Sequence, residues 1–399
     1  MILLSGADLV LADRILSPGR ITLDEGRIVA IESDSREPAA AGVHLDFRHH
    51  YIVPGFVDVH VHGIEGHDSL GEPDSIARIA ERLPRYGVTA FCPTTVACSP
   101  SALREVLDAV RAARVGPIGG RARVLPAHLE SNFINPEYRG AQPMRCLRLP
   151  PPIEPASDAT HGEFTGADIL AEIERASADV GIVTLAPELP GGVSLIRRLA
   201  GSGHRVSLGH SAATCEQAVE AIAAGARHAT HLFNRMPPLH HREPGLAGAV
   251  LASDEIAAEL ICDGHHVHPV MLRNAIAAKH PSRVMAITDG TAGSGLSPGM
   301  RTKLGDQIIT VRETGSFLDD GTLAGSVLTM EKAFRLLVGP VGLSPVDAVR
   351  LCSTTPAGEL GLHGHGVLSV GGVADLVVLN SRFEVVQTYI AGQLAYSAR

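Results

Sequence analysis

Short apolar, strand-like runs alternate with amphipathic helical stretches through the middle of this 399-residue chain. We expect eight strands, near residues 52–60, 88–95, 122–130, 180–186, 204–210, 227–232, 256–262 and 283–289. Helical patterns follow most of these runs, as at residues 101–113, 166–177, 215–224 and 269–278. Strand-then-helix units repeated eight times indicate an α/β fold built on a (β/α)8 TIM-like barrel.

The two ends of the chain have a different pattern, in which short apolar runs are separated by turns that contain Gly and Asp. Residues 1–52 and 365–399 each bury little alone, so we expect them to meet in one small β-sandwich domain. The barrel domain then spans residues 53–364. Three connections (131–165, 233–248 and 290–327) are rich in Gly, Pro and polar residues, and we expect them to be long loops that carry substrate contacts.

Composition excludes several classes of partner. Hydrophobic residues make up 45% of the chain and the formal net charge is -9, with no run of Lys and Arg, so we expect neither a nucleic-acid nor a membrane-surface partner. The six cysteines are scattered and form no Cys-x-x-Cys pair. The N-terminus lacks a basic start, and no uncharged apolar run approaches the roughly 18 residues of a membrane span. We therefore expect a soluble, cytoplasmic protein.

Metal-ligating residue types stand at the C-terminal ends of four predicted strands. In a barrel, these ends meet at one rim. Two histidines that are two positions apart on a strand also face the same side. Separately, each residue could be a core or surface histidine, a solvated strand end or a helix cap. Together they predict a divalent-metal site of the hydrolytic kind, with room for water. The candidate ligands are His60, His62, Glu130, His210 and His231.

Asp289 ends the eighth predicted strand, after the apolar residues Val284–Ile287. A carboxylate at that end of the strand would face the same rim as the candidate ligands. We therefore interpret Asp289 as the general base that takes a proton from the attacking water. The alternative is a structural cap for the glycine-containing loop that follows.

Several segments resemble the N-acetylglucosamine-6-phosphate deacetylases of the amidohydrolase superfamily. The similarity runs from about residue 50 to the C-terminus, and the most specific segments contain Thr-His-Leu-Phe-Asn, His-His-Arg-Glu-Pro-Gly, Asp-Gly-His-His-Val-His-Pro and Thr-Leu-Ala-Gly-Ser. The resemblance implies a metal-dependent amidohydrolase that removes the acetyl group from an N-acetyl amino-sugar 6-phosphate. The matching segments are residues 54–63, 128–142, 207–214, 230–249, 261–269, 287–291 and 321–330.

The resemblance also implies roles for individual residues. Glu130, His210 and His231 would bind one ion, and His60 and His62, with Glu130 shared, would bind a second. Some related hydrolases bridge two ions with a carbamylated lysine from a middle strand. No lysine precedes Lys279 in this chain, so that arrangement is excluded. Asp289 resembles the catalytic aspartate. The implied substrate contacts are His266, near the reacting carbonyl or the phosphate, Asn234, the backbone near Ala324 and Gly325, and Arg242, which would reach the sugar phosphate of a neighbouring subunit in a homodimer.

One departure bears on specificity. Members of this family usually have Gly-Pro-Phe after the metal-binding glutamate, whereas this chain has Ser131, Asn132 and Phe133. These polar side chains beside the site would alter sugar recognition.

N-acetylglucosamine 6-phosphate is the first predicted substrate. The galacto epimer, N-acetylgalactosamine 6-phosphate, or another N-acyl substrate is the alternative, and a non-catalytic barrel scaffold is a remote one. One or two divalent ions are expected per chain, zinc first, with iron, manganese and cobalt open because His and carboxylate sites accept all of them.

Overall fold

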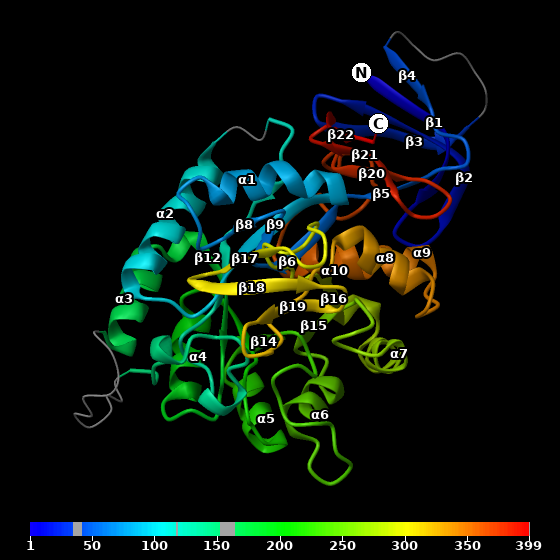
Figure 1. The fold of residues 1–399 in the computed structure, drawn as a ribbon. Coiled ribbons are helices and arrows are strands. Elements are labelled where there is room, and N and C mark those ends of the chain that lie inside the picture. Colours follow the sequence, from blue (N-terminus) through cyan, green and yellow to red (C-terminus); the bar gives the residue numbers. More distant parts are fainter. Residues whose placement is uncertain (35–41, 117–118, 152–163, 399) are drawn as a thin grey trace.

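The computed structural model describes residues 1–34, 42–116, 119–151 and 164–398. Within these ranges, eight parallel strands form the barrel (Figure 1), which confirms the predicted fold class. Their order around the barrel is β6 (Phe56–Val61), β9 (Val88–Thr95), β11 (Ala127–Glu130), β12 (Val180–Leu185), β13 (Arg205–Leu208), β14 (Ala226–Ala229), β15 (Ala257–Ile261) and β16 (Val284–Ile287), with the short β10 (Arg123–Val124) also paired to β9. The last strand meets the first through a parallel bridge between Val61 and Gly290, and Asp289 N donates to His60 O at 2.9 Å.

Helices cover the outside of the barrel, and several of them are amphipathic, with one apolar stripe buried. In α2, for example, Leu103, Val106, Leu107 and Val110 are buried at helical spacing. The N-terminus of α5 is fixed by a capping box between Thr214 and Gln217. The eight helices that follow the barrel strands in the described ranges are α1 (Ser75–Arg82), α2 (Pro100–Val115), α3 (Gly166–Arg175), α4 (Gly192–Gly201), α5 (Cys215–Ala223), α6 (Gly245–Ala252), α7 (Pro269–Lys279) and α8 (Met330–Val338).

The two ends of the chain lie side by side in a separate sheet (Figure 1) with its own apolar core, which includes Leu4, Ile21 and Leu376. β20 pairs with β5, so the C-terminal strands join the N-terminal ones. The division into two domains at residues 52/53 and 364/365 stays a prediction. The strands of this sheet, in order, are β22 (Gln393–Ser397), β21 (Val385–Ile390), β20 (Leu376–Leu379), β5 (Tyr51–Pro54), β1 (Ile2–Val10), β2 (Ile15–Asp24) and β3 (Arg27–Ser33), and β4 (Val43–Asp46) lies beside β1.

The predicted first barrel strand, at residues 52–60, was wrong at its start, because residues 52–54 belong to β5 of the terminal sheet. Gly55 separates the two strands. A Cβ atom there would lie 2.1 Å from Thr89 Oγ1, so only glycine lets the chain pass this close to β9. The first barrel strand therefore begins at Phe56.

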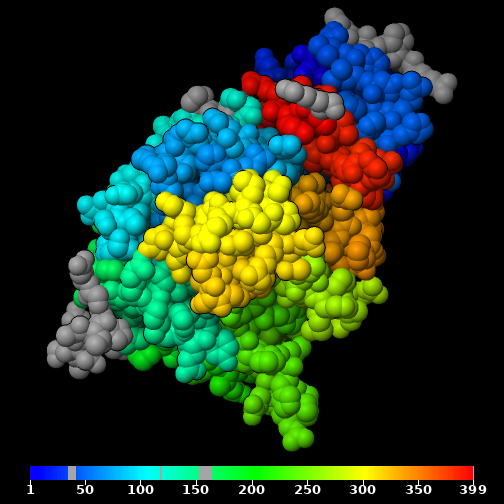
Figure 2. Space-filling view, viewed as in Figure 1, coloured from blue at the N-terminus to red at the C-terminus, as the bar shows by residue number. Residues whose placement is uncertain are grey.

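The predicted long loop at 290–327 was also partly wrong, since it contains an antiparallel sheet of β17 (Arg301–Leu304), β18 (Gln307–Arg312) and β19 (Gly315–Leu318). In β18, Ile309 and Val311 are buried on one face, and Leu304 and Ile309 pack with Val96. This segment, yellow in Figure 2, occupies the centre of the visible face. Part of the predicted loop 131–165, residues 152–163, lies outside the described residues.

Short elements complete the described chain. After β16, α9 (Pro345–Val349), a π-helical turn at Arg350–Thr354 and α10 (Thr355–Glu359) lead back toward the terminal sheet. None of the helices in the described ranges combines the length and apolar character needed to cross a membrane. The remaining short elements are β7 (Gly63–Ile64), β8 (His67–Asp68) and the 3-10 turns Leu83–Tyr86, Pro136–Tyr138, Met144–Cys146, Ser177–Asp179 and Pro281–Arg283.

Candidate metal centre

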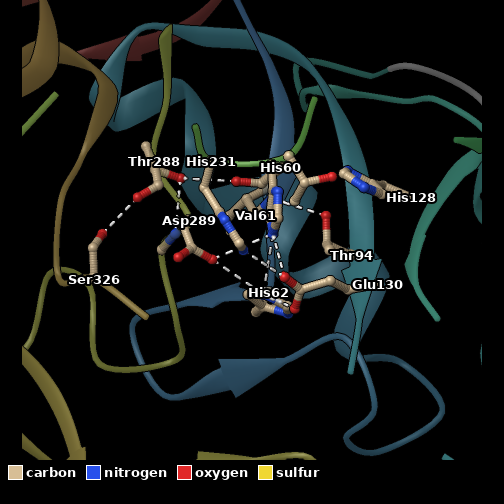
Figure 3. Close-up of polar contacts among 12 residues, drawn as sticks. His60, Val61, His62, Thr94, His128, Glu130, His231, Thr288, Asp289 and Ser326 are labelled. Carbon is tan, nitrogen blue, oxygen red and sulfur yellow. Dashed lines mark hydrogen bonds and ion pairs between the residues drawn. The ribbon is translucent and has the colours of Figure 1, made fainter. Parts of the chain in front are cut away.

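The six side chains predicted for the metal site and its base meet at one end of the barrel. Each lies within or directly after a barrel strand, and each is at most 6% exposed. Figure 3 shows five of these side chains pointing toward one another. The structure thus brings together His60, His62, Glu130, His210, His231 and Asp289.

Three of these residues have an unusual backbone conformation. The φ angles of His210, His231 and Asp289 are +48°, +30° and +47°. Residues other than glycine rarely adopt positive φ, and such conformations gather where a site requires them. Each of the three follows the end of its strand by two residues, so the left-handed conformation coincides with the positions whose side chains meet at the barrel mouth.

Glu130, His210 and His231 form the first group. Glu130 Oε1 lies 2.7 Å from His210 Nε2 and 2.8 Å from His231 Nε2, and the two nitrogens are 3.1 Å apart. His210 Nδ1 is 2.8 Å from the carbonyl of Tyr138, so Nδ1 carries the proton in the neutral ring and Nε2 presents a lone pair. Lone pairs that converge at these distances require a proton or a cation between them.

His60, His62 and Asp289 form the second group. The two Nε2 atoms are 3.3 Å apart, and Asp289 Oδ1 lies 3.3 Å from His60 Nε2 and 3.2 Å from His62 Nε2. Four tetrahedral ligands at the usual zinc–nitrogen distance are about 3.3 Å from one another. The three donor atoms are therefore already spaced as the ligands of a tetrahedrally coordinated ion are.

Glu130 lies between the two groups, but it is farther from the second. Its carboxylate oxygens are 3.9 Å from His60 Nε2 and 3.6 Å from His62 Nε2. The sequence assigned Glu130 to both ions and Asp289 to the base alone. The distances instead place Asp289 among the donors of the second group, with Glu130 as a neighbour that could bridge. Gln142, which the sequence analysis did not single out, donates to Glu130 Oε2 and accepts from Ala97 N at 2.7 Å.

The electrostatics of both groups favour a cation. Burial acts to raise the pKa of Glu130, but the charges and hydrogen bonds of His210 and His231 hold this pKa well below its usual value. Burial likewise acts to raise the pKa of Asp289, and His60 and His62 lower it. Burial acts to lower the pKa of His60, whereas Asp289 raises it well above its ordinary value. Buried carboxylates and imidazoles in this arrangement fit a divalent ion in each group.

A cavity of about 410 Å³ opens over the two groups. Asn234, His266 and Gly325 line it, as the resemblance implied, together with His62 and the side chains of the first group. Ala324 is 1% exposed and does not contribute to the lining, and its backbone N–H donates to Ser316 O. His266 is held by Asp263, whose Oδ2 lies 2.6 Å from His266 Nδ1.

Arg242 lies away from the cavity of its own chain. It is exposed on the loop that precedes α6, which projects from the barrel in Figure 1, and its side chain contacts His241 Nε2 at 3.1 Å. The structure therefore does not bring Arg242 to the candidate site within one chain. Its predicted role across a subunit interface stays a prediction.

Ser131 and Asn132 do not line the cavity either. The Ser131 hydroxyl donates to Thr184 O and accepts from Phe133 N. Asn132 Nδ2 lies 2.7 Å from the carbonyl oxygens of both Cys98 and Cys146. These side chains thus hold the loop that follows Glu130, which argues against the expected effect on sugar recognition.

Sequence reasoning missed a set of polar side chains under the rim. Glu259 lies 2.9 Å from His60 Nδ1, and Asp58 accepts from the Thr288 hydroxyl at 2.6 Å. Both carboxylates are 0% exposed. The sequence signal that could have found them is a charged residue inside an otherwise apolar strand. The outer face of a barrel strand packs against apolar helix surfaces, so such a charged side chain must face the lumen.

Comparisons with known proteins agree with this geometry. Residues 51–395 match the model of the Amidohydrolase family. The N-acetylglucosamine-6-phosphate deacetylase of Danio rerio is 37% identical, covering 95% of this chain and 90% of its own length. The N-acetylgalactosamine-6-phosphate deacetylase of Escherichia coli O157:H7 is 36% identical, covering 86% and 87%.

A solved structure is similar over almost the whole chain. It is a variant of N-acetyl-D-glucosamine-6-phosphate deacetylase from Mycobacterium smegmatis in complex with N-acetyl-D-glucosamine 6-phosphate, with 32% identity, a TM-score of 0.87 and 99% of each chain covered. The chain therefore belongs to the amidohydrolase family and, within it, to the N-acetylglucosamine-6-phosphate deacetylases.

Proposed function

We propose that this chain is a metal-dependent deacetylase that hydrolyses N-acetylglucosamine 6-phosphate to glucosamine 6-phosphate and acetate. The observation that carries the proposal is the meeting of two His/carboxylate groups at a 410 Å³ cavity in a chain of this family. An acetamide is a poor electrophile and its amine a poor leaving group, so the reaction needs both carbonyl activation and a proton donor.

A divalent ion, when bound, polarises the carbonyl and lowers the pKa of water. We assign Glu130, His210 and His231 to one ion and His60, His62 and Asp289 to the other, with Glu130 between them; distances of 2.7–3.3 Å within each group support this assignment. Zinc is the first candidate, and iron, manganese and cobalt suit the same donors.

Asp289 supplies the proton transfers. It takes a proton from the attacking water and then gives it to the departing nitrogen, as a general base that becomes a general acid. His266 holds the substrate. Burial acts to lower the pKa of His266, but the hydrogen bond and charge of Asp263 raise it above its ordinary value, which favours the protonated ring as a donor to a carbonyl or phosphate oxygen.

Recognition of the sugar phosphate requires cationic or N–H donors. Asn234 and the backbone at Gly325 line the cavity and suit this role, with Ala324 directly behind. The planar guanidinium group of Arg242 can donate two hydrogen bonds to a phosphate. Arg242 is exposed and lies outside the cavity of its own chain, so its side chain is free to reach the cavity of a second subunit. We therefore propose a homodimer in which Arg242 completes the neighbouring site.

The test is a comparison of kcat/KM for N-acetylglucosamine 6-phosphate, its galacto epimer and the unphosphorylated sugar. We expect the gluco phosphate to be the best substrate. Equal turnover of the phosphorylated and unphosphorylated sugars would contradict the phosphate assignment. The galacto epimer is the second candidate, because the relative from Escherichia coli O157:H7 is named for it.

Metal analysis separates an enzyme from a barrel scaffold. We expect one or two ions per purified chain. Less than one ion, together with no activity after zinc, iron or manganese is added, would favour the scaffold. We also propose a cytoplasmic location, with which the six free thiols are compatible.

A further inference from the structure

Below the first group (Glu130, His210 and His231) and the second group (His60, His62 and Asp289), which we call the two metal groups, the lumen of the barrel contains a layer of polar side chains. Branched apolar side chains usually fill this part of a barrel. All five members are 0% exposed, and they come from β11, β12, β13 and β15 and from the residue after β14, so they span five consecutive strands of the barrel. They are His128, Thr184, Ser207, Thr230 and Glu259. Buried polar groups of this kind are costly unless they are hydrogen-bonded, so their arrangement requires a reason.

Glu259, in the middle of β15, touches both metal groups from below. Its Oε2 lies 2.9 Å from His60 Nδ1 and 3.4 Å from the backbone N–H of His231. Its Oε1 has no hydrogen-bond partner in the described part of the chain, and it lies 3.8 Å from His128 Nδ1. One carboxylate thus connects the ring of a ligand in the second group with the backbone of a ligand in the first.

The hydrogen bond to Glu259 fixes the tautomer of His60. A carboxylate only accepts, so in the neutral ring His60 Nδ1 carries the proton and the lone pair on Nε2 faces His62 and Asp289. His62 differs, because its buried Nδ1 has no partner among the described residues. Of the two histidines in the second group, only His60 is therefore held by a side chain below it.

His60, His128 and Glu259 are also close enough to resemble a third metal group. Hydrogen bonds argue against this. His128 Nδ1 lies 2.9 Å from Val59 O and therefore donates, while His128 Nε2 accepts from the Thr184 hydroxyl at 2.8 Å. Thr184 is bonded to Thr230 at 2.7 Å, and Thr230 to Ser207 at 2.6 Å. The bond from His128 Nδ1 to Val59 O helps to position the residue that precedes His60.

We propose that Glu259 is a positioning residue, which holds His60 with Nε2 toward the second ion and thereby sets the occupancy of that ion. This inference rests on the proposed function, since it requires the ion between His60, His62 and Asp289. Partners of this kind typically change metal affinity by about 10- to 100-fold when they are removed.

The experiment compares Glu259→Gln with a matched control, Glu359→Gln. Glu359 also pairs with a buried histidine, its Oε2 lying 3.3 Å from His228 Nε2, but it ends α10 and touches none of the candidate ligands. Zinc titration followed by metal analysis should show two ions in the wild type and in Glu359→Gln. In Glu259→Gln, we expect one ion to be retained and the other to bind at least about 10-fold more weakly.

A second measurement gives a site-specific signature. Cadmium-113 NMR of the cadmium-loaded wild type should show two signals, of which Glu259→Gln shifts or removes one. Two ions bound with wild-type affinity and an unchanged spectrum would overturn the inference. Circular dichroism shows whether Glu259→Gln folds. If it does not, nitrogen-15 NMR spectra of the wild type with labelled histidine test the inference instead, because the inference requires His60 to be protonated on Nδ1. An unprotonated His60 Nδ1 would overturn it.

The experiments give different results if the inference fails and if the proposed function fails. A wild type that binds one ion and deacetylates the sugar phosphate would overturn the inference and leave the function standing. A wild type that binds two ions and shows the expected Glu259 effect, but does not deacetylate the sugar phosphate, would support the inference and overturn the proposed substrate.

Discussion

Replacing Asn132 by Ala should weaken the fold without changing which sugar the enzyme prefers. Asn132 is 3% exposed, and its Nδ2 donates to Cys98 O and Cys146 O, both at 2.7 Å. These bonds hold the loop that follows Glu130 to the segment after β9 at Cys98 and to the turn at Met144–Cys146. Alanine leaves both carbonyl oxygens without this donor, and each lost hydrogen bond costs roughly 1 kcal/mol net. We therefore expect a loss of about 2 kcal/mol in the free energy of unfolding.

The assay has two readouts. Urea unfolding followed by circular dichroism measures the stability, and kcat/KM for the gluco and galacto phosphates measures the preference. Asn132→Asp provides an internal control, since a carboxylate cannot donate and would place negative oxygen beside two carbonyls at pH 7. Asn132→Asp should therefore be less stable than Asn132→Ala, while both variants keep the wild-type ratio of the two kcat/KM values.

The opposite pattern would refute this reasoning. If Asn132→Ala unfolds like the wild type and the ratio of the two kcat/KM values changes tenfold, the side chain acts on the sugar. Ser131→Ala offers a parallel test, because the Ser131 hydroxyl is likewise bonded to Thr184 O and Phe133 N.

Three further variants test other parts of the structure. Asp289→Asn should lower kcat by about 10²- to 10⁴-fold and reduce the bound metal; unchanged metal content would leave Asp289 as the base alone. Arg242→Ala should raise KM for the phosphorylated sugar by about tenfold or more, and mixing it with Asp289→Asn should restore activity through mixed dimers; no recovery would contradict a role across the interface. Burial lowers the pKa of Lys279 to about 8 in the folded chain, and an unfolded lysine has a pKa of about 10.4. The unfolded chain then binds more protons between these values, so stability should rise with pH in that window, and a pH series of urea unfolding should lose this rise in Lys279→Met.

Much of the barrel could be predicted from the sequence because its strands are short apolar runs that end abruptly. The run before His210 and the run before Asp289 each stop within a few residues of a polar side chain, and the structure has β13 and β16 there. The boundary between the two sheets could not be read in the same way. Residues 51–61 are mostly apolar apart from Asp58 and His60, and the chain passes from β5 to β6 at Gly55, where it approaches Thr89 closely.

The grouping of the candidate ligands was harder to predict than their position at the rim. Residue types and strand ends indicated which side chains face the rim. Which of them lie close enough to share an ion depends on differences of a few tenths of an ångström, such as 3.3 Å from His60 Nε2 to Asp289 against 3.9 Å to Glu130. Asp289 has a positive φ of 47°, and the sequence around it carries no clear signal for this conformation.

The layer under the rim, in contrast, follows from a rule that the sequence already contains. Side chains two positions apart on a strand face the same side, so each ligand that lies on a barrel strand has a neighbour in the lumen two residues earlier. Counting back from His60 gives Asp58, and counting back from Glu130 gives His128; both are 0% exposed and hydrogen-bonded inside the barrel. A polar residue at such a position cannot face the apolar helices outside, so it must pair with other luminal groups. Applied to every strand, the same argument predicts that Glu259 faces the lumen and requires a donor, and His60 Nδ1 is the donor that the structure provides.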